Sequence, residues 1–190
     1  LPLKVSGYAL ADFEGQMYLF GGWDGENVLD IVLRYDPVED RWESMTPMPT
    51  ARAYAGAASA GGKIYVIGGW DGEKDVNVSV SYMPSRDRED ETAWERFESF
   101  SDDFEAYSVN SLSELIFVIG KEVIYYYSFQ NEAWNFFAND PNIPIYKDNA
   151  VSSVEGYFYM IGGQDENGLH YDGNIRYQAI YTIAIPQIIN

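Results

Sequence analysis

One short motif occurs four times in this chain of 190 residues. In its clearest form, a run of β-branched and aromatic residues ends at a Gly-Gly pair and continues into Trp-Asp-Gly. The copies, about 42 to 52 residues apart, are QMYLFGGWDG at 16–25, KIYVIGGWDG at 63–72, LIFVIGK at 115–121 and YFYMIGGQD at 157–165. A repeat of this period predicts similar units that stack on one another.

Each repeat predicts short β-strands joined by hairpins. The motif strand follows a tight turn, such as Glu14-Gly15 or Gly61-Gly62, and precedes two further strands. We expect no amphipathic helix, and we interpret residues 85–91 as a longer hairpin turn in the second repeat. The expected strands are 8–13, 16–22, 28–35, 41–45, 52–60, 63–69, 76–82, 94–97, 106–112, 115–120, 123–129, 133–137, 149–154, 157–163 and 174–185.

A tyrosine and a tryptophan recur at a fixed spacing on the last two strands of a repeat. The pairs are Tyr35 and Trp42, Tyr127 and Trp134, and, with five extra residues in the turn, Tyr82 and Trp94. In the fourth repeat the same step from Tyr177 arrives at Ala184, so the tryptophan is absent. Large aromatic side chains at fixed positions are suited to fill the space between adjacent sheets. The sequence therefore predicts an all-β fold, a β-propeller of four-stranded antiparallel blades.

This pattern resembles the kelch repeat. The residues that carry the resemblance are Gly21-Gly22, Tyr35, Asp36-Pro37, Trp42, Gly68-Gly69, Tyr82, Trp94 and the connector Pro47–Arg52. The third repeat has Gly120-Lys121 in place of the double glycine, and the fourth keeps Gly162-Gly163. The resemblance covers essentially the whole chain. It is specific for the fold and says little about function.

The resemblance implies a closed ring of six or seven blades. We divide the chain into a single kelch-like segment with blades at about 8–46, 51–100, 104–139 and 147–190. We therefore expect the segment to be part of a larger ring, completed by missing blades or by another chain. Closure with four blades is the alternative. The opening residues 1–7 resemble a connector, and the apolar stretch 180–185 needs a strand partner.

The formal charge of −18 and the pI near 4.1 argue against nucleic acid or an anionic membrane surface as the partner. One explanation of the negative charge is that it keeps the chain soluble. The other is that acidic loops bind a basic partner or a divalent cation. The absence of cysteine excludes disulfides and thiolate sites, and a single histidine excludes a site with two imidazoles. No membrane span or signal peptide is visible. The composition leans towards an exported or cell-surface prokaryotic protein.

In the kelch family, the loops after the double glycines and the connectors between blades form a shallow ligand surface, which we call the loop face. Position by position, its residues here are Trp23, Asp24, Arg52, Tyr54, Trp70, Asp71, Gln164 and Asp165. The positions equivalent to Arg52 hold Val5, Phe104 and Tyr146, so a ring of arginines is not expected. The structural alternative is that the tryptophans cover blade edges and the Asp-Gly pairs make turns.

The sequence favours binding over catalysis. The loop at 165–168 resembles part of a calcium loop but lacks the spaced ligand set, so we expect no cofactor and no metal, and calcium is the alternative. Kelch-like copper oxidases need histidines and a cysteine, which this chain cannot supply. We predict a non-catalytic module for protein–protein interaction. The alternative is carbohydrate binding, or a sugar-directed isomerase or hydrolase, on the same face.

Overall fold

The structure is a computed structural model of the whole chain. It describes residues 1–88, 92–98, 106–112, 114–120, 123–138, 146–147, 149–165 and 167–179. The chain divides into two compact units, Leu1–Ile145 and Tyr146–Asn190, and each is described by itself. The predicted strand at 180–185 and the predicted connector residue Phe104 lie outside the described residues.

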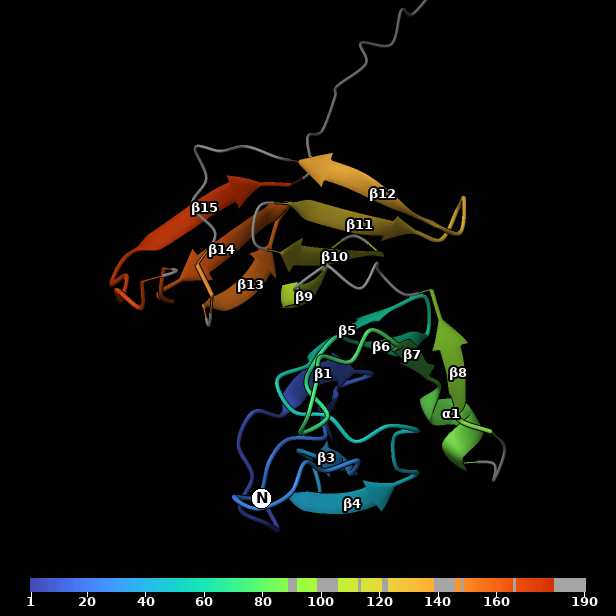
Figure 1. Cartoon of the computed structure of the whole chain (residues 1–190). Coiled ribbons are helices and arrows are strands. Elements are labelled where there is room, and N and C mark those ends of the chain that lie inside the picture. The colour runs from blue at the N-terminus through green and yellow to red at the C-terminus, as the bar shows by residue number, and fades with distance from the viewer. Residues whose placement is uncertain are drawn as a thin grey trace, which may run out of the picture. The chain divides into compact units, whose positions relative to one another are not determined.

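The described residues form antiparallel sheets in which each strand pairs with the next along the sequence (Figure 1). We call these sheets blades 1 to 4. Blade 1 contains β1 (Ala9–Phe13), β2 (Gln16–Phe20), β3 (Val32–Asp36) and β4 (Arg41–Met45). Blade 2 contains β5 (Gly56–Ala60), β6 (Lys63–Ile67), β7 (Ser79–Tyr82) and β8 (Trp94–Phe97). Blade 3 contains β9 (Ala106–Leu112), β10 (Leu115–Gly120), β11 (Ile124–Ser128) and β12 (Ala133–Ala138). Blade 4 contains β13 (Ala150–Val154), β14 (Tyr157–Ile161) and β15 (Asn174–Gln178).

The predicted strand order and the predicted hairpin turns are confirmed. Between β1 and β2, Glu14 and Gly15 have φ of 51° and 76°, and between β5 and β6, Gly61 and Gly62 have φ of 56° and 76°. Positive φ at both central residues gives the turn that matches the twist of an antiparallel pair. The turns therefore set the register that the motif strands share.

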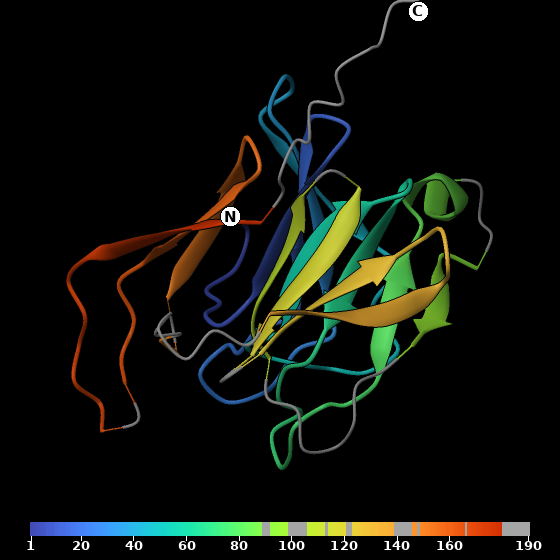
Figure 2. The ribbon, with the colours of Figure 1, turned by 90° about the horizontal axis from the view of Figure 1, so that it is seen from above.

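The structure differs from the sequence prediction between β7 and β8. Residues Pro84–Arg88 form a short helix, α1, which interrupts the hairpin at one end of blade 2 (Figures 1 and 2). Proline is well suited to the first position of a helix because its fixed φ is helical and its missing N–H is not needed there. A helix of one turn has no amphipathic period that a sequence pattern could reveal.

Three strands begin at least three residues later than expected. β3 begins at Val32, β5 at Gly56 and β7 at Ser79, whereas the sequence pattern suggested starts at residues 28, 52 and 76. For β5 the difference arises because residues 52–55 belong to a connector that pairs with loops instead of with the neighbouring strand of blade 2.

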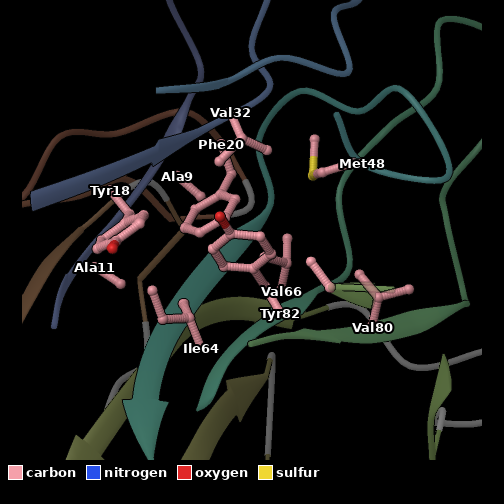
Figure 3. Close-up of a cluster of buried hydrophobic side chains, with 11 residues drawn as sticks. Ala9, Ala11, Tyr18, Phe20, Val32, Met48, Ile64, Val66, Val80 and Tyr82 are labelled. Atoms are coloured by element: carbon pink, nitrogen blue, oxygen red, sulfur yellow. The ribbon is translucent and has the colours of Figure 1, made fainter. Parts of the chain in front are cut away.

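Blades 1 and 2 are held together by an apolar cluster between their facing sheets (Figure 3). Tyr18 and Phe20 of β2 face Tyr82 of β7, with both ring centroids 5.9 Å from that of Tyr82. Phe20 also meets Trp94 of β8 edge to face, at 6.1 Å. Aromatic pairs in such tilted geometries add to the free energy gained by burying the rings.

Blades 2 and 3 repeat this arrangement. Tyr65 of β6 contacts Phe129 at the end of blade 3, with the ring centroids 5.6 Å apart. The Trp134 indole N–H donates to the carbonyl of Glu98, which follows β8, at 3.1 Å. Likewise, the Trp94 indole N–H donates to the carbonyl of Thr46, which follows β4, at 3.1 Å. Each tryptophan therefore ties its blade to the outer strand of the preceding blade.

The tyrosine–tryptophan spacing seen in the sequence has a simple structural cause. In three blades the two residues lie directly opposite each other on the last two strands. Their ring centroids are 5.0, 4.9 and 5.3 Å apart in blades 1, 2 and 3. The fixed spacing in the sequence thus reflects a cross-strand pair whose two side chains lie on the same face of the sheet.

Helix α1 adds a polar link between the first two blades. The Asp87 carboxylate accepts hydrogen bonds from the Thr46 N–H at 2.9 Å, the Thr46 hydroxyl at 2.5 Å and the Tyr82 hydroxyl at 2.5 Å. Burial raises the pKa of Asp87, but these hydrogen bonds outweigh it, and the net pKa lies below the ordinary value. Asp87 therefore connects the end of blade 1 to the aromatic cluster of blade 2.

Blade 4 forms the second unit. On one face of its middle strand, Phe158 and Met160 are buried, whereas Ile161 is 54% exposed. Before the blade, Tyr146 stacks on Tyr171 with the ring centroids 4.5 Å apart. No helix within the described part of the chain is long and apolar enough to span a membrane.

Candidate functional site

The connectors between blades pass very close to the backbone of the double glycines. This close approach positions the loops of the candidate site. A Cβ atom added to Gly21 would lie 2.1 Å from the carbonyl oxygen of Arg52, and one on Gly22 would lie 2.5 Å from Val5 Cγ2. Their φ values of 61° and 107° also disfavour other residues. This end of the motif strand therefore leaves no room for a side chain.

The residue after each double glycine pairs with a connector through two backbone hydrogen bonds. Trp23 pairs with Ser6 at 2.8 and 2.9 Å, Trp70 with Ala53 at 2.8 and 2.9 Å, and Gln164 with Lys147 at 2.9 and 3.0 Å. Blade 3 has no such loop among its described residues: the Gly120 N–H donates to the carbonyl of Val123 at 2.9 Å. Three of the four blades thus present a loop of one design.

Each of these loops is closed by an aspartate whose Oδ1 accepts two backbone N–H groups. The hydrogen bonds, 2.7 to 2.9 Å long, run to Asp24 from Glu26 and Asn27, to Asp71 from Glu73 and Lys74, and to Asp165 from Asn167 and Leu169. Hydrogen bonds from backbone N–H groups hold the pKa of all three carboxyls below the ordinary value. The carboxylates are therefore ionised and build the turns, as the structural alternative proposed.

The two loop tryptophans differ in exposure. Trp23 is 37% exposed, and Trp70 is half-buried. The two loops are neighbours in the first unit, since a Cβ atom added to Gly72 would lie 3.5 Å from Val28 Cγ2. In the second unit Gln164 is half-buried at the equivalent position.

Tyr54 has a conformation that few residues other than glycine adopt. Its φ is 59°, and its side chain is 61% exposed. The connector pairings make it equivalent to Gly7, whose φ is 60°. The Tyr54 N–H donates to the Gly7 carbonyl at 2.6 Å, and a Cβ atom on Gly7 would lie 2.8 Å from the Tyr54 ring. The connectors of blades 1 and 2 thus meet at Tyr54, with its ring over glycine and its outer face in solvent.

Arg52 points inwards rather than into solvent. Its side chain is 0% exposed, and its Nη1 donates to the carbonyls of Gly68 at 3.1 Å and Val78 at 2.9 Å. Burial lowers the pKa of Arg52 to about 10. No described residue accepts a hydrogen bond from Nη2. Arg52 therefore ties the connector to the loop of blade 2 from below and does not reach a ligand on the surface.

Two exposed apolar side chains near these loops were not among the residues singled out from the sequence. Tyr8, which follows Gly7, is 39% exposed, and Leu169 in the loop of blade 4 is 71% exposed. An apolar residue in the middle of a polar loop was the available signal for Leu169. Within the described ranges, no three His, Cys, Asp or Glu side chains are grouped closely enough to hold a metal ion.

Comparison with known proteins agrees with the repeat. The kelch motif model matches residues 5–49 and 51–82. The mouse (Mus musculus) Kelch-like protein 35 is 29% identical over 163 residues, which are 85% of this chain and 27% of that protein. The human (Homo sapiens) Kelch-like protein 35 is 38% identical over 52 residues, which are 27% of this chain and 9% of that protein. The chain thus spans only about a quarter of the length of the mouse relative.

The solved structure of YjhT superposes on 94% of this chain and 64% of its own, with a TM-score of 0.80 and 14% identity. At this identity the likeness concerns the fold alone. Together with the blade order, the opposed tyrosine–tryptophan pairs and the crossed double glycines, these matches show that residues 5–49 and 51–82 carry the kelch motif and that the chain has the β-propeller fold.

Proposed function

We propose that this chain is a non-catalytic binding module that recognises a protein partner through its loop face. In the first unit the proposed contact residues are Trp23, Asp24, Tyr54, Trp70 and Asp71. In the second unit Gln164 and Asp165 hold the equivalent positions. The observation that carries the proposal is Tyr54, an exposed aromatic side chain in a left-handed backbone conformation.

The conformation of Tyr54 lowers stability without a compensating gain in burial. A left-handed conformation costs a non-glycine residue roughly 1 to 2 kcal/mol. Glycine fills the equivalent position 7 with nearly the same φ, so the fold itself does not require a side chain there. Since more than half of the Tyr54 side chain is exposed, the strain is best explained by a contact outside the chain.

A second exposed aromatic residue lies close to Tyr54 along the backbone. Trp23 pairs with Ser6, and the next residue, Gly7, accepts the hydrogen bond from Tyr54. Tyrosine and tryptophan are enriched at protein interfaces because they combine a large apolar area with a polar group. The carboxylate of Asp24 adds a negative charge beside this pair of aromatics.

The charge state of the loop carboxylates supports binding rather than catalysis. A carboxyl group that serves as a general acid near neutral pH needs a raised pKa. The pKa values of Asp24, Asp71 and Asp165 are instead lowered, and the Oδ1 of each already accepts two backbone N–H groups.

Carbohydrate is the alternative ligand, because an exposed tryptophan beside a carboxylate also suits a sugar ring. The two classes can be separated by titrating free monosaccharides and oligosaccharides against the tryptophan fluorescence of the chain. A saturable change that Trp23→Ala abolishes would support the sugar alternative. No change is expected if the partner is a protein.

A displayed library of random linear peptides tests the protein proposal. We expect peptides selected on the wild-type chain to lose at least tenfold in affinity for Tyr54→Gly and for Trp23→Ala. Tyr54→Gly relieves the strain, so its unfolding free energy should stay within about 1 kcal/mol of wild type. Phe136→Ala, at a 58% exposed site on β12, is the matched control and should keep full affinity. Selected peptides that bind both loop variants as tightly as wild type would show that the loop face is not the binding surface.

A further inference from the structure

Strand β12 (Ala133–Ala138) is the outermost strand of blade 3 (Figure 1). Blade 3 has the same four strands as blades 1 and 2, so β12 forms the edge of a complete blade. Among the described residues, no further strand pairs with this edge. A strand at the edge of a sheet has backbone N–H and C=O groups that can pair with a strand of another chain.

The outer strand of blade 3 lacks the charges that the outer strands of blades 1 and 2 have. Strand β4 contains Arg41 and Glu43, and β8 contains Glu95 and Arg96. Strand β12, with the sequence AWNFFA, contains no charged residue, and it is six residues long against five for β4 and four for β8. Charged residues and short length are common ways in which proteins prevent pairing at sheet edges. Strand β12 has neither.

An exposed aromatic ring lies on the same strand. Phe136 stands two residues after the tryptophan of its blade, where blades 1 and 2 have Ser44 and Arg96. Its side chain is 58% exposed and lies on the same face of the sheet as Trp134. Within the blade it is opposite Tyr125, with the ring centroids 6.1 Å apart and 81° between the planes. An exposed phenyl ring on an uncharged edge strand points to a contact with another chain.

We propose that two copies of this chain associate edge to edge, by antiparallel pairing of β12 with β12 of the second copy about a two-fold axis at Asn135. Such an interface uses the same surface in both copies and closes at two. The register places Phe136 of each copy opposite Trp134 of the other, on one face of the joined sheet. This repeats the cross-strand aromatic pair that Phe136 makes with Tyr125. The pairing uses residues 134–136, which precede the irregular end of the strand. This inference does not rest on the proposed ligand.

The residue at the proposed axis favours a second copy of the chain over an unrelated strand. Blades 1 and 2 have Glu43 and Glu95 at the position of Asn135. If β4 or β8 paired with itself about this position, two carboxylates would lie directly opposite each other, which is destabilising. Asn135 is uncharged, and its side chain already bonds within its own blade: Nδ2 donates to the Ala133 carbonyl at 2.8 Å, and Oδ1 accepts from Asn131 at 3.3 Å. Two chains of charge −18 can therefore pair at β12 without opposed like charges on the strand itself.

Light scattering on the purified full chain tests the proposal. We expect a mass of twice 21.6 kDa at micromolar concentration and physiological ionic strength, where a Debye length of about 8 Å screens the charge of each copy. Phe136→Asp should halve the mass, because it places two carboxylates in the contact. Ser44→Asp, at the equivalent and exposed position of β4, is the matched control and should leave the mass unchanged. A wild-type mass of 21.6 kDa would overturn the proposal, and so would a dimer that Phe136→Asp leaves intact.

The absence of cysteine allows a direct test of the register. Residues directly opposite each other in an antiparallel pair have Cβ atoms about 4.5 to 5.5 Å apart. A short thiol cross-linker should therefore join Asn135→Cys chains to one another in high yield. Ser44→Cys, the control on β4, should remain a single chain under the same conditions. If Asn135→Cys were cross-linked no faster than Ser44→Cys, β12 would not lie at a two-fold axis and the proposal would be overturned.

Discussion

At the scale of single residues, the buried Arg52 side chain holds the connector that enters blade 2. Its direction is set by the carbonyls of Gly68 and Val78 in blade 2, which accept hydrogen bonds from its guanidinium group. Nothing in the local sequence indicates this direction, because a connector has no strand period, whereas opposed cross-strand residues such as Tyr82 and Trp94 keep their spacing in any copy of the hairpin.

Arg52→Ala should destabilise the chain by about 2 to 4 kcal/mol, because it leaves two buried carbonyls without their donor and opens a cavity. Urea unfolding would measure this loss. The emission of Trp70 should also shift, since Arg52 supports the loop through Gly68.

Arg41→Ala is the control for this substitution. Arg41 is an exposed arginine paired with Glu39 and Glu43, and exposed ion pairs contribute only about 0 to 1 kcal/mol. If Arg52→Ala cost no more than Arg41→Ala, the buried arginine would not hold the connector.

At the scale of elements, the strands could be predicted and the helix could not. The motif strands can be recognised in the sequence from their composition and from the turns that precede them. Helix α1 is too short to have a period of its own, and tertiary contacts of Asp87 with Thr46 and Tyr82 hold it in place. Of the candidate site, the loops and their turns were predicted, whereas the left-handed conformation of Tyr54 emerged only from the structure.

Asp87→Asn should reduce the unfolding free energy by about 1 to 3 kcal/mol, because an amide cannot accept all three hydrogen bonds that the carboxylate accepts. The folded-state pKa of Asp87 is lowered, so its contribution is present above the unfolded pKa, near 4, and is lost as the pH falls through the folded value.

Thermal unfolding from pH 7 to pH 3 would check both statements. The wild-type chain should lose more stability across this range than Asp87→Asn does, whereas Asp30→Asn, at an exposed site, should follow wild type. Parallel pH curves for wild type and Asp87→Asn would contradict the role assigned to this carboxylate.

At the scale of the whole molecule, the stability of the first unit depends on aromatic rings between blades, and two of the tyrosines among them must stay neutral. Burial raises the pKa of Tyr65 to about 12, and burial together with the hydrogen bond to Asp87 raises the pKa of Tyr82 further. Tyr65 lies between blades 2 and 3, and Tyr82 lies between blades 1 and 2. The rings that join neighbouring blades are therefore also the groups that resist ionisation.

At alkaline pH, ionisation of these buried tyrosines should therefore separate the blades, at a pH too low to break covalent bonds. A tyrosine whose folded pKa is raised contributes stability that is fully present below the unfolded pKa, near 10, and is lost as the pH rises through the folded value. We expect the unfolding free energy to fall steeply between pH 10 and about 12, with tyrosinate absorbance rising cooperatively with unfolding.

Tyr65→Phe should flatten this fall, because the phenyl ring keeps the aromatic contacts with Phe97 and Phe129 but cannot ionise. Tyr54→Phe, at an exposed side chain, should leave the slope as in wild type. Tyrosinate absorbance that rises gradually and well before unfolding would mean that the blades tolerate ionised tyrosines between them.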